Sequence, residues 1–285
     1  SDGAGVVLEV GPGVTDMAPG DRVFGLLPGT MAPIGVTDRR LLAPIPHHWT
    51  YPQAAAIPVA YLTAYYALTH LAKLQPGENI LIHAATGGVG TAATQIAQHL
   101  GATIYATAHP TKWHTLTHLP PPHLANSRTL DYQHQFPHQH VILNALAGQH
   151  TDTSLNLLHP GGRFIEMGTT DLRTNTHHTH PHLTYHPFQL PHTHPDHIQH
   201  MLTTLLNLFH HNHLHHPHTT THPIHHTHHA LRTLQQATHT GKLVLTLPTP
   251  PHPNGTTLIT GTGTLATHLA HHLTTTGRTH HLILA

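Results

Sequence analysis

A short apolar run followed by a glycine turn constrains this chain more than any other feature. Residues 80–83 have the length and composition of a buried parallel strand, and Gly87, Gly88 and Gly90 follow closely. An amphipathic helix pattern then leads to a second β-rich run at residues 103–107. Strand, glycine turn, helix and strand in this order predict a βαβ unit.

The glycine turn predicts what this unit binds. Glycines at such a turn let the backbone approach a pyrophosphate, and the helix N-terminus offers free N–H groups and the positive end of its dipole. We therefore expect a dinucleotide site at Gly87, Gly88 and Gly90. An α/β domain without a nucleotide is the alternative, because a glycine turn alone is a weak motif.

The end of the second strand indicates which dinucleotide binds. NAD-binding units usually place Asp or Glu there, on the ribose 2′-hydroxyl, but this sequence runs through His109 to Lys112 with no carboxylate. Lys112 can pair with a 2′-phosphate, and Arg128 lies near the expected end of the next strand. The pattern favours NADPH over NADH. The alternative for Lys112 is a solvated lysine at a helix start.

Composition excludes several classes of function. The formal net charge is zero and 8% of the 285 residues are charged, which argues against nucleic acid as a partner. The sequence has no apolar stretch of about 18 residues, so we expect no membrane span. The absence of cysteine excludes disulfides and thiolate chemistry and fits a cytoplasmic protein without requiring one.

Histidine is unusually abundant, with 41 residues and the densest tract at 209–229. A metal store or a pH sensor is one interpretation, because imidazole both ligates metals and titrates near neutral pH. However, the histidines are spread along most of the chain after residue 83, where charged surface residues would be expected. This distribution favours a compositional drift over a dedicated metal site.

The βαβ rhythm continues beyond the first unit. Strands are predicted at 124–128, 140–148 and 161–168, with a helix at 154–158 between the last two. Alternating strands and helices imply a parallel sheet, whose ligands bind beyond the carboxyl ends of the strands. The residues expected at such ends are Asn144, Leu146, Met167 and Gly168. For Leu146 and Met167, packing in the core is the favoured alternative.

The flanking regions have a different pattern. Short strands at 3–10 and 22–26, separated by Gly-Pro turns, suggest a β-barrel-like module, part of which we expect to lie outside this chain. Helical segments follow at 51–73, and a further amphipathic helix is predicted at 197–210. After a His-rich linker come another helix and a strand at 243–248. A second βαβ unit, interpreted as the truncated start of another domain, has a GxGxxA turn at Gly261, Gly263 and Ala266.

These residues resemble the enoylreductase domain of modular type I polyketide synthases, a zinc-free branch of the medium-chain dehydrogenase/reductase superfamily. The matching stretches cover residues 1–248 nearly end to end and include GAGVVLEVGPGV, ILIHAATGGVGTAATQIAQHLGA, TKWHTL, ANSRTLDY, VILNALAG and HTGKLVLTLP. The tail resembles the opening of the ketoreductase domain that follows in such synthases. The His- and Thr-rich composition is similar to that of some mycobacterial members.

The resemblance implies an α/β fold in which a Rossmann nucleotide-binding domain is inserted into a GroES-like β-rich substrate domain. The expected boundaries are residues 1–55 for the truncated start of the substrate domain and 56–189 for the Rossmann domain. Residues 190–248 would return to the substrate domain, and 249–285 would be a linker and a truncated ketoreductase-like unit.

The resemblance also implies a reaction, the NADPH-dependent reduction of a trans-2-enoyl thioester carried on an acyl carrier protein. Hydride goes to the β-carbon and a proton to the α-carbon, so the site must hold a nicotinamide against the alkene and supply a proton donor. The implied partners are the carrier-bound enoyl chain and the neighbouring ketoreductase and dehydratase domains. The oligomeric state is left open, with a homodimer through the parent synthase as one alternative.

Site residues follow from the resemblance one by one. Thr63 is expected near the nicotinamide, and Val89 joins the three glycines at the pyrophosphate. Family members have been discussed with a lysine and an aspartate as proton donors, and the matching residues are Lys112 and Asp131. One lysine cannot easily serve both the 2′-phosphate and the nicotinamide end, so we favour the phosphate for Lys112. Asp131 as donor is a hypothesis, because an exposed aspartate after a strand is common.

Departures from the family keep other functions open. Thr169 stands where relatives carry a lysine, which suggests as an alternative a catalytically silent structural domain of a synthase. A stand-alone quinone or enone reductase would share the cofactor site but would not run into a second βαβ start. Ser1 and Asp2 occupy positions where zinc-dependent relatives carry a His-Glu pair, so with no cysteine the usual zinc sites cannot be assembled.

Overall fold

The computed structural model describes residues 1–173, 176–248, 256–261, 263–277, 279 and 281–285. The chain forms two compact units, Ser1–Thr246 and Leu247–Ala285. In the described part of the chain, no helix is both long and apolar enough to cross a membrane.

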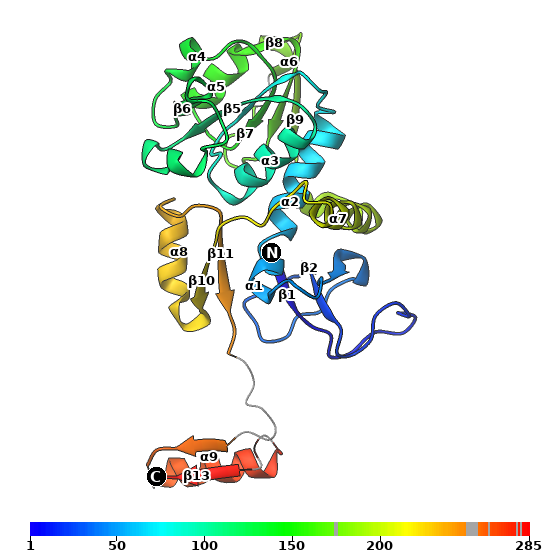
Figure 1. Ribbon diagram of the computed structural model, residues 1–285, viewed down its shortest axis with the longest axis vertical. Helices are drawn as coiled ribbons and strands as arrows, with labels where there is room; N and C mark the ends of the chain where they lie inside the picture. The colour runs from blue at the N-terminus through cyan, green and yellow to red at the C-terminus, as the bar shows by residue number, and fades with distance from the viewer. Residues whose placement is uncertain (174–175, 249–255, 262, 278, 280) are drawn as a thin grey trace. The chain divides into compact units, whose positions relative to one another are not determined.

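The largest sheet of the first unit is a six-stranded parallel sheet, drawn in the upper part of Figure 1. Its order is β6-β5-β4-β7-β8-β9, so the chain leaves the central strand β4 toward one edge and then crosses back to build the other. This is the doubly wound order of dinucleotide-binding folds, whose ligands bind where the winding direction changes. The α/β fold predicted from the sequence is confirmed. The strands are β4 (Asn79–Ile82), β5 (Thr103–Ala108), β6 (Leu124–Asn126), β7 (Gln139–Asn144), β8 (Leu158–Glu166) and β9 (Thr184–Pro187).

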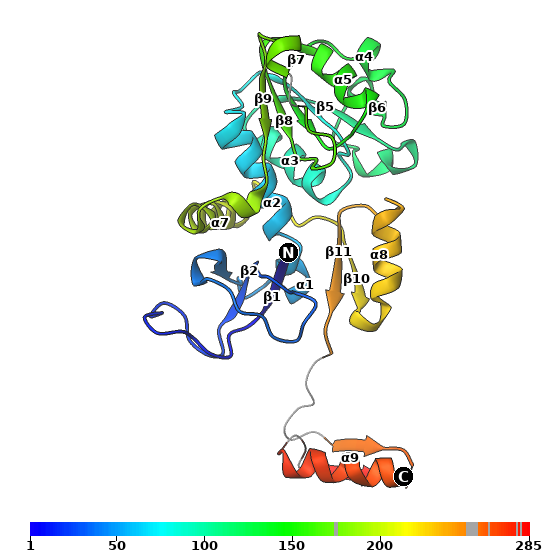
Figure 2. The same cartoon turned by 180° about the vertical axis from the view of Figure 1, so that it is seen from behind.

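Helices cover both faces of this sheet (Figures 1 and 2). Successive strand residues point to opposite faces: Ile80 and Ile82 join the larger core with α3 (Gly88–His99), and Leu81 joins the smaller core. Both cores are almost fully inaccessible to solvent, which explains the continuous apolar runs in the sequence. The helices on the second face are α4 (Tyr132–Gln135) and α5 (Gln149–Asn156), and a short α6 (Thr176–Thr179) precedes β9.

The N-terminal residues form a three-stranded antiparallel sheet, β1-β2-β3, where a barrel-like module was expected. A helical segment follows. The side chains of Thr50 and Gln53 form a reciprocal capping box at its start. The second helix continues directly into a π-helix at Tyr66–Leu71. The elements are β1 (Asp2–Val6), β2 (Arg22–Leu26), β3 (Leu42–Pro44), α1 (Tyr51–Ala55) and α2 (Pro58–Tyr65).

The C-terminal part of the first unit contains the predicted amphipathic helix, α7 (Pro195–His210), which packs its apolar face on α2. Beyond it, β10 (Thr219–Pro223) and β11 (Lys242–Thr246) pair in parallel, joined by α8 (Thr227–Gln235). The sequence analysis was wrong to treat the His-rich tract as a linker throughout. The β-branched threonines of β10 form a strand without an apolar run to announce it. Short 3₁₀ turns occur at Arg39–Leu41, Pro110–Thr115, Pro121–His123, Leu190–His192 and Ile224–His226.

Two further differences from the sequence prediction concern boundaries. The helix expected at 154–158 begins earlier, at Gln149, and ends at Asn156 because Leu158 already belongs to β8. Strand β9 was not predicted. It pairs with only one neighbour, β8, and its four residues are polar or half-exposed, so it lacks the apolar signal of a central strand.

The second unit is a single βαβ element, as predicted. Strands β12 (Thr256–Ile259) and β13 (His281–Leu284) pair in parallel and are joined by α9 (Thr264–Thr275). Part of the predicted GxGxxA turn lies outside the described residues at position 262.

Candidate functional site

The glycine turn joins β4 to α3 at the carboxyl end of the central strand. Gly87 precedes α3 with an extended backbone (φ −80°, ψ 175°), and none of the described side chains caps the helix there. A Cβ atom at Gly90 would lie 2.4 Å from the carbonyl oxygen of Ala84 and 2.6 Å from the Cα atom of Ala85. Only glycine fits this close contact of helix and turn. The uncapped N–H groups are suited to bind an anion such as a pyrophosphate.

Strand β11 starts beside this turn, an arrangement that the sequence analysis missed. The N–H of Gly241 donates to the carbonyl oxygen of Thr86 at 2.8 Å. The Nζ atom of Lys242 lies 2.9 Å from an Asp2 carboxylate oxygen, and a Cβ atom at Gly88 would lie 2.8 Å from Cδ of Lys242. The lysine stem therefore covers Gly88 while Asp2 pairs with its ammonium. The stretch HTGK contains these residues, but nothing in its spacing shows that it folds back onto residue 88.

Lys112 and Arg128 lie at the carboxyl ends of β5 and β6, which we call the basic edge. The Nζ atom of Lys112 donates to the carbonyl oxygens of Ala237 at 2.5 Å and His239 at 2.6 Å. Partial burial, reinforced by the charge of Arg128, lowers the pKa of Lys112. Within the described residues, no carboxylate forms an ion pair with either side chain. The two predicted phosphate ligands are thus close enough to interact and carry uncompensated charge.

Asp131 lies at the start of α4 and is exposed to solvent. Its carboxylate accepts a hydrogen bond of 2.7 Å from the hydroxyl of Thr129. Strands β5 and β4 separate β6 from β7, so roughly 14 Å of sheet, three inter-strand spacings, lie between the strand that Asp131 follows and the carboxyl end of β7. Its role as a proton donor stays a prediction.

The carboxyl ends of β7 and β8 carry a buried polar pair, which we call the paired edge. The Nδ2 atom of Asn144 donates to Oε2 of Glu166 at 2.7 Å, and the N–H of Gly168 donates to the other carboxylate oxygen at 2.6 Å. The amide of Asn144 also bonds both backbone groups of Leu146, at 2.8 and 3.2 Å. Asn144 and Glu166 are 0% and 1% exposed, and burial raises the pKa of Glu166. Sequence reasoning missed Glu166, whose only signal was a single acid at the end of an apolar strand.

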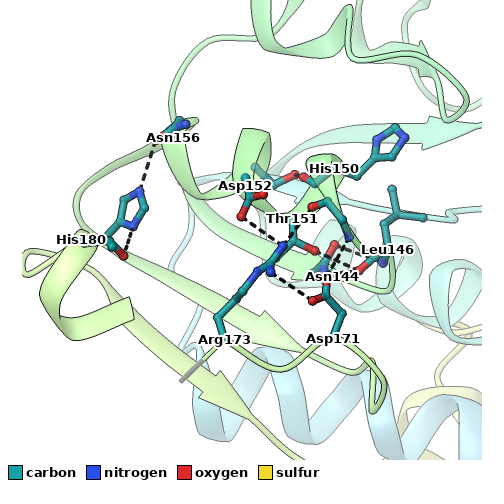
Figure 3. A network of polar contacts seen from close by, with 12 residues as sticks. Asn144, Leu146, His150, Thr151, Asp152, Asn156, Asp171, Arg173 and His180 are labelled. Atoms are coloured by element: carbon teal, nitrogen blue, oxygen red, sulfur yellow. Dashed lines mark hydrogen bonds and ion pairs between the residues drawn. The ribbon is translucent and has the colours of Figure 1, made fainter. Parts of the chain in front are cut away.

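A charged cluster ties together the loops that follow β7 and β8 (Figure 3). The guanidinium of Arg173 lies 3.1 Å from carboxylate oxygens of both Asp171 and Asp152. It also donates to the carbonyl oxygen of Gly148 at 3.1 Å, and the N–H of Gly148 donates to Asp171 at 2.7 Å. The loop after β7, the start of α5 and the loop after β8 therefore share one network.

The remaining predicted residues are half-buried. Thr63 lies in α2, Val89 in the first turn of α3, and Leu146 and Met167 in the loops after β7 and β8. Val89 and Met167 also pack against the larger core, and the N–H of Met167 donates to the carbonyl oxygen of Asn144 at 3.0 Å. The packing role that the sequence analysis weighed for Met167 is therefore present, and its contact with a cofactor stays a prediction.

A buried histidine joins the central strand to its neighbours on the second face. His83 follows β4 directly; its Nδ1 lies 2.8 Å from the hydroxyl of Thr107 and its Nε2 lies 2.9 Å from the hydroxyl of Ser154. The hydroxyl of Tyr132 completes the network, 3.1 Å from Ser154. Burial lowers the pKa of His83 to about 3, so the ring is neutral at physiological pH.

Comparisons with known proteins place this site in a superfamily. Residues 122–245 match a family described as zinc-binding dehydrogenase. The spectinabilin polyketide synthase system protein NorB of Streptomyces orinoci is 48% identical over 290 residues, covering 99% of this chain. The chain spans only 13% of the length of that curated relative.

Solved structures narrow the family. The structure of CurK enoyl reductase superimposes with a TM-score of 0.80 at 36% identity, covering 86% of this chain and 77% of that one. The CurF ER cyclopropanase of the curacin A biosynthetic pathway gives a TM-score of 0.80 at 32% identity, covering 87% and 78%. The fold is that of a medium-chain dehydrogenase/reductase. Within that superfamily, the chain belongs to the enoyl reductases of modular polyketide synthases, as the resemblance predicted.

The zinc implied by the description of the matched family does not fit the residues present. The sequence contains no cysteine, and the described residues include no group of three or more histidine, aspartate or glutamate side chains arranged to hold a metal ion. Tetrahedral zinc sites in proteins need three or four such ligands. The described residues therefore do not fit a tetrahedral zinc site.

Proposed function

We propose that this chain reduces the carbon–carbon double bond of a trans-2-enoyl thioester carried on an acyl carrier protein, with NADPH as the reductant. The observation that carries the proposal is the combination of the glycine turn with the basic edge. The turn lies so close to the start of α3 that only glycine fits at Gly90. Lys112 and Arg128 present positive charge where NAD-binding units place an acid.

The residues divide into three groups by role. The N–H groups of Gly87, Gly88, Val89 and Gly90 would hold the pyrophosphate. Lys112 and Arg128 would hold the 2′-phosphate. The nicotinamide end would lie against Thr63, Leu146, Met167 and Gly168, and the buried Asn144 would hold Leu146 in place. The bound cofactor supplies the hydride, and the chain's own residues orient it and the alkene.

Proton delivery to the α-carbon needs a group near the nicotinamide end. Lys112 and Asp131 are the candidates that the resemblance provides. We assign Lys112 to the 2′-phosphate because it lies at the basic edge beside Arg128. Asp131 follows β6 on the same side of the sheet, with β5 and β4 between it and the nicotinamide end, so it is no better placed as the donor than Lys112.

The proposed setting is a multidomain synthase. The curated relatives are polyketide synthases, which supports neighbouring synthase domains as partners. We propose a ketoreductase and a dehydratase among them, and we keep the expected domain boundaries, with Rossmann residues 56–189 between substrate-domain segments 1–55 and 190–248, and a ketoreductase-like unit at 249–285.

The test is a fluorescence titration of NADPH and NADH against the chain and its Lys112→Ala variant. Loss of a charge-assisted contact with the 2′-phosphate should weaken NADPH binding by about 1.5–3 kcal/mol and leave NADH nearly unchanged. Arg232→Ala, which removes an exposed cation from α8, is the matched control and should change neither. Equal weakening of both cofactors by Lys112→Ala would contradict the assignment.

A catalytically silent structural domain is the second candidate. Thr169, exposed after β8, stands where the family resemblance implies a lysine, and the absence of that charge beside the proposed nicotinamide end would favour a silent domain. A silent domain predicts no cofactor binding by the folded wild-type chain, which the same titration measures.

A further inference from the structure

We infer that Glu166 is a positioning residue for the nicotinamide half of the cofactor, and that its buried carboxylate holds the two strand ends that would contact that half. The inference rests on the proposed function. It deepens that function by assigning a role to an acid that neither the sequence pattern nor the proposed reaction uses.

Glu166 lies at the carboxyl end of β8, beside the end of β7. It is the last residue of β8 and is 1% exposed, and the strand leads directly into Met167 and Gly168. Its partner Asn144 is the last residue of β7, the adjacent parallel strand. The Glu166–Asn144 contact thus joins two neighbouring carboxyl ends, on the side of the sheet where ligands of doubly wound folds bind.

Each oxygen of the Glu166 carboxylate accepts a hydrogen bond from a different residue. One accepts from the side-chain amide of Asn144 at 2.7 Å, and the other accepts from the N–H of Gly168 at 2.6 Å. A Cβ atom at Gly168 would lie 2.8 Å from that second oxygen, so the backbone is drawn close. Asn144 in turn fixes the backbone of Leu146 through both of its amide atoms. One buried acid therefore orders residues of both loops.

Both partners of Glu166 are donors, which distinguishes a positioning role from a catalytic one. A carboxylate accepts both hydrogen bonds, whereas a protonated acid would direct its own proton toward a donor. The burial and pairing of both oxygens also leave no free atom to pass a proton to a substrate. Glu166 therefore acts as an anchor for the groups that donate to it.

A separate network supports the same loops. Arg173 bridges Asp171 to Asp152 (Figure 3) and also donates to the carbonyl oxygen of Gly148. The loops are thereby held before any cofactor binds. Such preorganisation reduces the ordering that binding would otherwise cost.

The experiment compares two ligands that share one half. NADPH contacts both edges, whereas adenosine 2′,5′-bisphosphate has the 2′-phosphate but no nicotinamide. We would measure the dissociation constants of both for the wild-type chain and for Glu166→Gln, in which the new amide NH₂ must face one of the two donors. The expected result is NADPH binding weakened at least tenfold and bisphosphate binding within twofold of wild type.

Glu78→Gln is the matched control. Glu78, unlike Glu166, forms an ion pair: it contacts Arg163 at 2.5 Å beside the start of β4, away from the carboxyl ends of the strands. This variant should lower stability without separating the two ligands. If Glu166→Gln does not fold, Asn144→Ser breaks the same contact from the other side and should give the same separation.

The outcomes are distinct. Unchanged NADPH affinity in folded Glu166→Gln overturns the inference, and so does equal weakening of both ligands. A folded wild-type chain that binds neither ligand overturns the proposed function itself, together with the inference that rests on it. Selective loss of NADPH in Glu166→Gln but not in Glu78→Gln supports the positioning role.

Discussion

The basic edge and the paired edge lie on the same sheet but are built on opposite principles. At the basic edge, Lys112 and Arg128 have no carboxylate partner among the described residues, and Arg128 is exposed. At the paired edge, Glu166 and Asn144 satisfy each other and are inaccessible to solvent. The basic edge presents unpaired charge to a ligand, whereas the buried polar groups of the paired edge already have hydrogen-bond partners within the protein.

The difference indicates how the two halves of a dinucleotide would be recognised. A charged phosphate can be bound by cations that have no carboxylate partner beforehand, because charge-assisted hydrogen bonds are strong. A nicotinamide ring must be held in one orientation for hydride transfer, and orientation requires a rigid wall. We expect mutations at the basic edge to alter cofactor choice and mutations at the paired edge to alter cofactor geometry.

The largest expected effect is at the glycine turn, which both halves of the cofactor would need. In Gly90→Ala, the new methyl group would collide with the backbone of Ala84 and Ala85, so α3 must move away from the turn. We expect a loss of about 3 kcal/mol in the free energy of unfolding and loss of both NADPH and bisphosphate binding. Urea unfolding and titration would measure these. Gly5→Ala, where the added Cβ meets open space, should change stability by less than about 0.5 kcal/mol.

Acidification should weaken the sheet beneath the two edges. The pKa of His83 is about 3 in the folded protein, below its unfolded value near 6.5. The unfolded state therefore binds the extra proton, and stability falls as pH drops from about 6.5 toward 3, by up to about 1.4 kcal/mol per pH unit. This amounts to about 1.6 kcal/mol between pH 6.5 and pH 5. Urea unfolding midpoints measured across this range would show it.

Other histidines also have pKa values lowered by burial, so a variant must isolate this contribution. His83→Gln should be less stable at pH 7.5 but should lose up to one proton's worth of pH dependence between pH 6.5 and 5. The exposed His228→Gln should retain the wild-type slope. An unchanged slope in His83→Gln would show that His83 is not the titrating group.

The smallest expected effect concerns the paired edge alone. Arg173→Gln removes two partly exposed ion pairs and the bond to Gly148, which together contribute about 1 kcal/mol. We expect NADPH binding to weaken two- to fivefold with bisphosphate binding unchanged, and amide hydrogen exchange of residues 145–149 to accelerate. Exchange rates equal to wild type would show that the loops are held without Arg173.

The hydrophobic pattern of the sequence was sufficient to predict strands that are buried on both faces of the sheet. Strand β4, the glycine turn and α3 were predicted because residues 80–82 are apolar and buried on both faces of the sheet and only glycine fits at Gly90. The same reasoning failed for β9 and β10, which lie at edges and carry polar residues. An edge strand buries little, so its sequence has no apolar run to read.

The sequence by itself determined the fold class, the family and the charge expected at the basic edge, because these depend on local patterns and residue types. Only the tertiary structure showed that Lys242 covers Gly88, that Asp2 pairs with that lysine, and that Glu166 anchors Asn144. Asp2 and Lys242 are 240 residues apart, and Glu166 and Asn144 are 22 apart on separate strands. Such contacts arise from strand register and chain crossings, and no local sequence pattern encodes them.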